Sequence, residues 1–191
     1  EECMPVINTG LRGVEVASTK ISQVDAKAGK LIYRGHLVTD LAGKASFEEV
    51  VFLLLYERLP RREELEDFTR KLKQKRGLPP GGLGFLRSIP KDANPMDVIQ
   101  AGAVMLVQAD PQAGENSMDA ALASAEFLVA GLATLIAAWE RIRKGHEPVE
   151  PADDLGHAAN FLYMLTGKRP DKEVARFFDT ALILHAEHSF N

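Results

Sequence analysis

The feature that most constrains this chain is an alanine-rich, largely apolar stretch from about Ser117 to Lys144. At 1.5 Å per residue it predicts a single helix roughly 40 Å long. Because it carries little charge before Glu140, such a helix needs packing partners along most of its length. The stretch therefore favours a multi-helical protein. Periodicity alone does not decide whether this element is a central core helix or a helix–helix dimer interface. Its large apolar residues are Leu122, Phe127, Leu128, Leu132, Leu135, Ile136 and Trp139.

Start and stop signals divide the rest of the chain, from residue 38 onward, into further helices. Ser46-Phe47-Glu48-Glu49 reads as a capping box, and Asn94-Pro95 as an N-cap with proline at the first helical position. Gly77 to Gly84 holds four glycines and two prolines and predicts a loop. The first of these expected helices starts at Ser46 and ends before Leu59-Pro60. The next ones cover about 61–76, 94–108, 117–144 and 154–166, with Asp153 as a possible cap of the fourth, and the last begins near 172.

One region, residues 14–35, is rich in strand-forming residues. Val14-Glu15-Val16 and Lys30 to Arg34 are short and contain β-branched or aromatic side chains, and the segment Asp25 to Gly29 between them predicts a turn. We therefore expect an all-α protein with one small N-terminal β-hairpin.

Composition narrows the possible functions. The net charge of −4 and the isoelectric point of about 5.8 argue against non-specific binding to nucleic acid or to anionic membranes. No uninterrupted apolar stretch approaches the roughly 20 residues of a membrane span. The one cysteine, Cys3, excludes an intrachain disulfide and favours a cytoplasmic location.

The last residues hold the clearest candidate site. His185 and His188 are three residues apart, Asn191 is three further on, and an apolar helical run precedes them. Residues at this spacing share one helix face, so two imidazoles and a carboxamide could bind one small anion. Two alternatives stay open. One is an inert, hydrogen-bonded pair of core histidines. The other is a metal site, although zinc-binding histidines on a helix are usually four apart.

In order along the chain, the motifs resemble those of the citrate synthase family of bacterial and archaeal type. Each motif alone is weak evidence, whereas the ordered series is specific and covers almost the whole chain. The matching segments are Gly10-Leu11-x-Gly13-Val14, Gly29-Lys30-Leu31-x-Tyr33-Arg34-Gly35, Ser46-Phe47-Glu48-Glu49, Leu53-Leu54-Leu55-Tyr56, Arg58-Leu59-Pro60, Pro95-Met96, His157-Ala158-Ala159-Asn160-Phe161-Leu162-Tyr163-Met164 and Leu182-Ile183-Leu184-His185-Ala186-Glu187-His188-x-Phe190-Asn191.

The resemblance implies a helical homodimer that condenses acetyl-CoA with oxaloacetate, without a cofactor. By position, His188 matches the oxaloacetate-binding histidine and Asn191 the asparagine that helps to shape the active site, while His185 is expected to support them. The resemblance also implies that helices 94–108 and 117–144 form the dimer contact. Two positions depart from the family pattern: Asn94 replaces the usual histidine and Gly156 the usual serine.

The family's catalytic residues and its small CoA-binding domain are expected beyond Asn191. Residues 1–191 are therefore expected to be the N-terminal portion of the large domain, with no catalytic residue and no activity alone. Three alternatives remain: a 2-methylcitrate synthase, a citryl-CoA-cleaving relative, and a non-catalytic helical dimerisation module.

Overall fold

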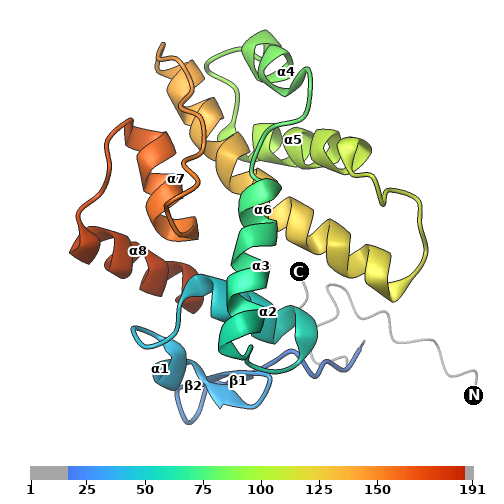
Figure 1. The fold of residues 1–191 in the computed structure, drawn as a ribbon, viewed down its shortest axis with the longest axis vertical. Helices are drawn as coiled ribbons and strands as arrows, with labels where there is room; N and C mark the ends of the chain where they lie inside the picture. Colours follow the sequence, from blue (N-terminus) through green and yellow to red (C-terminus); the bar gives the residue numbers. More distant parts are fainter. Residues whose placement is uncertain (1–16, 188–191) are drawn as a thin grey trace, which may run out of the picture.

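The computed structural model describes residues 17–187. Helices form most of this part of the chain, and a small antiparallel sheet lies at its N-terminal end (Figure 1). The all-α expectation is thus confirmed. The elements are β1 (Ser22–Asp25), β2 (Lys30–Tyr33), β3 (His36–Leu37), α1 (Val38–Leu41), α2 (Phe47–Tyr56), α3 (Arg62–Gln74), α4 (Gly82–Ser88), α5 (Pro95–Ala109), α6 (Met118–Arg143), α7 (His157–Thr166) and α8 (Lys172–Leu184).

The predicted helix starts with local caps are confirmed. Ser46 and Glu49 form the capping box of α2: the Ser46 hydroxyl accepts from the Glu49 backbone N–H, and the Glu49 carboxylate accepts from the Ser46 N–H at 2.7 Å. The Asn94 side chain caps α5, which has Pro95 in its first turn. The Ser117 hydroxyl caps α6. Each of these side chains satisfies a backbone N–H that has no partner inside its own helix.

The sheet has three strands rather than the two of the predicted hairpin, in the order β1-β2-β3. The strand that pairs with β2 is Ser22–Asp25, whereas the predicted first strand, residues 14–16, lies outside the described residues. The turn at 25–29 is confirmed. Asp25 Oδ1 accepts from the N–H groups of Lys27 and Ala28, and Gly29 has a φ of 63°. This turn sets the register of β1 against β2.

Helix α4 corrects the prediction of a loop at residues 77–84, because it begins at Gly82 inside that stretch. Gly81, at a φ of 84°, turns the chain into the helix, a conformation that glycine adopts at low cost. Leu86 of α4 is then completely buried in the main hydrophobic cluster. Tertiary packing thus outweighs the low helix propensity of Gly82 and Gly84.

Helix α7 begins at His157, not at Asp154 as predicted, and Gly156 occupies the N-cap position instead of Asp153. The loop before it is held in place by other groups. Arg76 Nη1 donates to the carbonyl oxygen of Leu155 at 2.9 Å, and Asn160 Oδ1 accepts from the Ala152 N–H at 2.8 Å. These contacts fix residues 152–155 as irregular chain.

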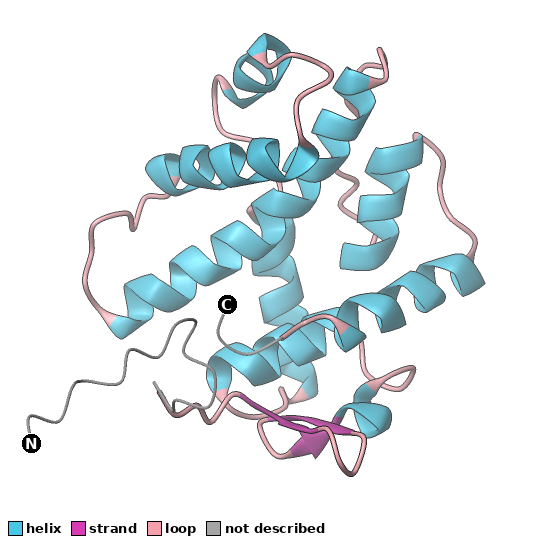
Figure 2. Ribbon diagram, turned by 180° about the vertical axis from the view of Figure 1, so that it is seen from behind, coloured by secondary structure: helices cyan, strands magenta, loops and turns pink. Residues whose placement is uncertain are grey.

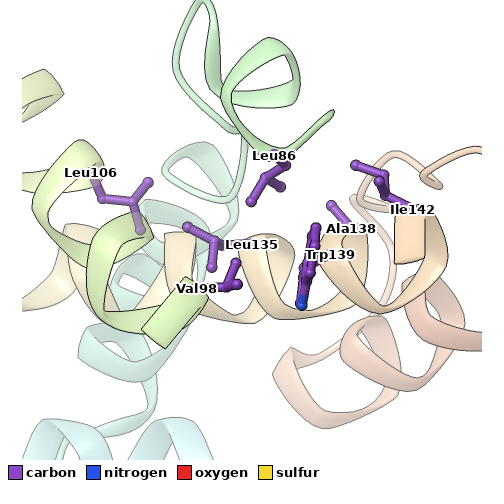
Figure 3. Packing of buried hydrophobic residues seen from close by; sticks show 7 residues of the cluster. All are labelled: Leu86, Val98, Leu106, Leu135, Ala138, Trp139 and Ile142. Atoms are coloured by element: carbon purple, nitrogen blue, oxygen red, sulfur yellow. The ribbon is translucent and has the colours of Figure 1, made fainter. Parts of the chain in front are cut away.

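Helix α6 is the central element and crosses the molecule between α5 and α7 (Figure 2). One face packs into a cluster drawn from α4, α5 and α6, in which Leu135 and Trp139 lie against Leu86 and Val98 (Figure 3). Gly102 permits the close approach of α5 and α6, since a Cβ atom added there would lie 2.3 Å from Leu135 Cδ1.

Within residues 17–187, α6 is the one helix long and apolar enough to cross a membrane, judged by length and composition. Central helices of globular proteins meet the same criterion, and α6 contacts α3, α4, α5 and α7. Only 39% of its most apolar window is buried in the described structure. Most of the other residues of α6 are partly buried, and those at its N-terminal end are exposed.

Candidate functional site at the end of helix α8

Helix α8 leads directly into the histidine motif, so its attachment to the rest of the fold positions the candidate site. It packs on α7 through the stacked rings of Phe161 and Phe178, whose centroids are 5.3 Å apart. Near its C-terminus, Ile183 is completely buried in a second cluster with residues of the sheet, α1 and α2. The end of α8 is thus held by apolar contacts on two sides.

Two polar contacts also hold the C-terminal end of α8. The Tyr33 hydroxyl lies 3.4 Å from the carbonyl oxygen of Leu184 and 3.3 Å from that of Glu187, so it donates to a pair of acceptors. Burial raises the pKa of Tyr33 above its usual value of 10.0, and the phenol therefore stays protonated at neutral pH. Carbonyl groups at a helix C-terminus lack partners in the helix, and Tyr33 supplies a donor to them.

His185 is the C-cap residue of α8 and is exposed. Its Nδ1 lies 2.7 Å from the carbonyl oxygen of Ala181. Because a carbonyl oxygen only accepts, Nδ1 donates to it in this contact. His185 thus has a hydrogen-bond partner within the protein, and its supporting role toward the site stays a prediction.

His188 and Asn191, the two residues predicted to bind substrate, lie outside the described residues. Their roles stay predictions. Among residues 17–187, no group of three or more histidine, cysteine, aspartate or glutamate side chains is arranged to hold a metal ion. That finding covers His185 but not His188.

A polar junction joins α8 to α2 and α2 to α7. The Asp179 carboxylate of α8 accepts from the Phe47 N–H at the start of α2, at 3.1 and 3.2 Å. The Glu48 carboxylate of α2 accepts in turn from the His157 N–H at the start of α7, at 2.7 Å. Each carboxylate satisfies an N–H at the positive end of a neighbouring helix. The junction therefore links α2, α7 and α8 through hydrogen bonds at two helix starts.

Burial shifts the pKa values of this junction in opposite directions. Burial raises the pKa of the Asp179 carboxyl to about 6, and the charges of Glu48 and Glu49 raise it too, while the hydrogen bond from Phe47 acts the other way. Burial lowers the pKa of His157 to about 4, against the opposing effect of Glu48. The imidazole is therefore neutral at physiological pH.

Sequence reasoning assigned no function to Tyr33, Glu48 or Asp179. Tyr33 stood in a motif segment, but its partners are more than 150 residues away in the chain. The one sequence feature that could have indicated a role for Tyr33 is the motif Tyr33-Arg34-Gly35. A tight turn alone would not require its aromatic and basic residues.

Comparison with solved structures places the described fold among citrate synthases. The crystal structure of citrate synthase from Pyrobaculum aerophilum superposes with a TM-score of 0.89 and 39% identity, covering 94% of this chain and 47% of that chain. The citrate synthase of Thermotoga maritima gives a TM-score of 0.82 and 34% identity, over 97% of this chain and 48% of that one. The large helical core and the small N-terminal sheet are thus those of citrate synthase enzymes.

The sequence comparisons agree. The family described as "Citrate synthase, C-terminal domain" matches residues 10–191. Citrate synthase from Deinococcus radiodurans is 39% identical over 98% of this chain and 50% of its own length. A 2-methylcitrate synthase from Mycobacterium tuberculosis is also 39% identical, over 98% of this chain and 47% of its own length. The chain belongs to the citrate synthase family, and it spans about half the length of the curated relatives that it matches.

Proposed function

We propose that residues 1–191 are the N-terminal portion of the large domain of an enzyme that condenses acetyl-CoA with oxaloacetate to give citrate and CoA. The observation that carries this proposal is the family match, which extends through the histidine motif to residue 191. In the proposed site, His188 donates to a carboxylate of oxaloacetate and Asn191 supplies a second polar contact. A charge-assisted hydrogen bond of this kind gives both affinity and orientation.

The reaction explains why the chain alone is expected to be inactive. Acetyl-CoA is a weak carbon acid, so forming its enolate needs a positioned base and a donor that stabilises the developing negative charge. The two carboxylates of oxaloacetate also need cationic partners. We place these groups, together with a small CoA-binding domain, in the part of the enzyme beyond residue 191.

The choice of acyl-CoA is a separate question, because a 2-methylcitrate synthase is as similar to the chain as a citrate synthase is, at 39% identity. The second candidate is therefore the condensation of propionyl-CoA with oxaloacetate. The two substrates differ by one methylene group, which an apolar pocket discriminates by about 1–3 kcal/mol.

Thiol release with each acyl-CoA, in the presence of oxaloacetate, tests both candidates in the full-length protein. A ratio of kcat/KM values that favours acetyl-CoA supports the first, and the reverse ratio supports the second. Absence of thiol release with both would refute condensation altogether. The purified 191-residue chain serves as the control and is expected to show no turnover.

We also propose that the enzyme is a cytoplasmic homodimer whose contact includes α5 and α6. Four large apolar side chains on these helices are exposed: Met96, Val104, Val107 and Met118. The partly buried surface of α6 gives further area for close packing of a second copy. Sedimentation velocity at micromolar concentration tests the proposal, with a dimer expected. A Val104→Asp variant should shift the protein toward monomer, whereas a monomeric unsubstituted protein would contradict the proposal.

A further inference from the structure

Tyr33, the last residue of β2, and Arg34, which follows it, reach the C-terminal ends of two different helices. Arg34 Nε and Nη2 lie 3.3 and 3.0 Å from the carbonyl oxygen of Leu54, in the last turn of α2. Tyr33 Oη lies 3.4 and 3.3 Å from the carbonyl oxygens of Leu184 and Glu187, at and after the end of α8. Arg34 and Tyr33 therefore supply donors to carbonyl groups in the last turns of α2 and α8, where intrahelical partners are lacking, and Tyr33 also reaches the Glu187 carbonyl just beyond α8.

The Tyr33 phenol is rigidly placed. Its residue is completely buried and lies in the central strand, where Ser22 of β1 and His36 of β3 pair with it. The chain reverses directly after it, because Arg34 and Gly35 both have positive φ angles, 46° and 87°. Positive angles at both positions are typical of the tight turns that join adjacent antiparallel strands.

The contacts of the ring reach the same helix end as the hydroxyl does. Tyr33 shares its hydrophobic cluster with the completely buried Ile183 of α8 and with Val50 and Leu53 of α2. Ala186, just after α8, packs against the same cluster. The ring and the hydroxyl of Tyr33 thus both act on residues 183–187.

Covalent geometry carries this constraint one residue further. The carbonyl of Glu187 belongs to the same planar peptide group as the backbone nitrogen of His188. A donor that fixes the direction of this carbonyl therefore fixes the plane from which His188 continues. A side chain that binds substrate needs its position held to about 0.5 Å by such supporting contacts.

We propose that Tyr33 is a positioning residue for oxaloacetate, and that its hydroxyl holds the chain between α8 and His188. This inference rests on the function proposed above. Tyr33 itself touches no substrate; it acts through the peptide group that leads to His188. The expected signature is weaker use of oxaloacetate with little change in the use of acyl-CoA.

The test is a Tyr33→Phe variant of the full-length protein, which removes the hydroxyl and keeps the ring. The matched control is Tyr56→Phe, because the Tyr56 hydroxyl donates to Glu126 Oε1 at 2.6 Å and so joins α2 to α6 instead. For Tyr33→Phe we expect the KM for oxaloacetate to rise about three- to tenfold, the effect of losing a typical hydrogen bond. The kcat and the KM for acyl-CoA should change by less than about twofold. Tyr56→Phe should lower the melting temperature and leave the KM for oxaloacetate unchanged.

An unchanged KM for oxaloacetate in Tyr33→Phe, or an equal rise in both variants, overturns the proposal. Hydrogen exchange, measured in the same full-length proteins, provides a readout that does not depend on activity. The peptide that covers residues 184–191 should exchange several-fold faster in Tyr33→Phe than in Tyr56→Phe, and equal rates overturn the positioning role. If the unsubstituted protein releases no thiol but the exchange difference is present, the proposed function fails while the structural link from Tyr33 stands.

Discussion

The carboxylate of Glu48 caps a helix that begins 109 residues later in the chain. Its Oε1 accepts from the backbone N–H of His157 at 2.7 Å, and both residues are buried. Gly156, the N-cap residue of α7, has no side chain to do this. A group on α2 therefore replaces the local cap that α7 lacks, and the start of α7 depends on the packing of α2.

Replacement of Glu48 by alanine should destabilise the fold by about 1–2 kcal/mol, because it leaves the buried His157 N–H without its acceptor. Glu48→Gln keeps an oxygen that can accept and should cost less than half as much. Urea unfolding followed by circular dichroism measures both values. Equal losses in the two variants would show that charge, rather than capping, is what the site requires.

His157 should make the fold less stable in acid. Its pKa in the folded state is lowered to about 4, below the usual 6.5, so between these values the folded state binds fewer protons than the unfolded state. The free energy of unfolding therefore falls as the pH drops from about 6.5 to 4, by roughly 2–3 kcal/mol. A His157→Gln variant should lack this component. The comparison is made by urea unfolding at several pH values, and parallel curves for the two proteins would contradict the assignment.

Asp179, unlike His157, should make the fold more stable as the pH falls. Its pKa is raised to about 6 in the folded state from the usual 3.8, so the folded state binds more protons between these values. The free energy of unfolding, compared with that of Asp179→Asn, should therefore rise as the pH falls from about 6 to 4. Because Asp179 is partly exposed, solvent screening reduces the effect to about 1–2 kcal/mol. A difference between the two proteins that falls, or stays level, across this range would exclude the shift.

The packing of α5 on α6 should tolerate no side chain at Gly102. An alanine Cβ would lie 2.3 Å from Leu135 Cδ1, so Gly102→Ala should destabilise the fold by about 1–3 kcal/mol. The matched control is Gly84 in α4, where an added Cβ atom would meet no other atom within 4 Å. Gly84→Ala should therefore be neutral or stabilise the fold by up to about 1 kcal/mol. Thermal unfolding of the two variants gives the comparison, and a neutral Gly102→Ala would mean that the two helices can move apart without cost.

The parts of the fold that could be predicted from the sequence are those specified within a few residues. Ser46 and Asn94 each cap a helix that starts where their motifs predict. Ser117 caps α6, whose start near this residue was predicted from the apolar stretch. The starts of α4 and α7 could not be predicted in this way. Leu86 draws α4 into the core against its local propensity, and the cap of α7 comes from a distant helix.

In the candidate site, too, the locally specified features could be predicted from the sequence and the long-range contacts could not. The three-residue spacing of His185 and His188 is a local pattern, and the helix that precedes it was predicted. The hydroxyl of Tyr33 holds that helix from 151 residues away, and Asp179, on the helix itself, accepts from the Phe47 N–H, which is 132 residues away. No local pattern reports such contacts, because they exist only once the sheet, α2 and α8 have packed together.

The central proposal is that His188, which follows α8 in the chain, binds oxaloacetate. The most direct test is calorimetric titration of oxaloacetate into the full-length protein and its His188→Ala and His185→Ala variants. Loss of the His188 hydrogen bond should raise the dissociation constant about 10- to 100-fold. His185→Ala should change it by less than about threefold and mainly lower the melting temperature, because the His185 Nδ1–H donates to the Ala181 carbonyl of its own helix. Equal weakening by the two substitutions, or unchanged affinity in His188→Ala, would contradict the account.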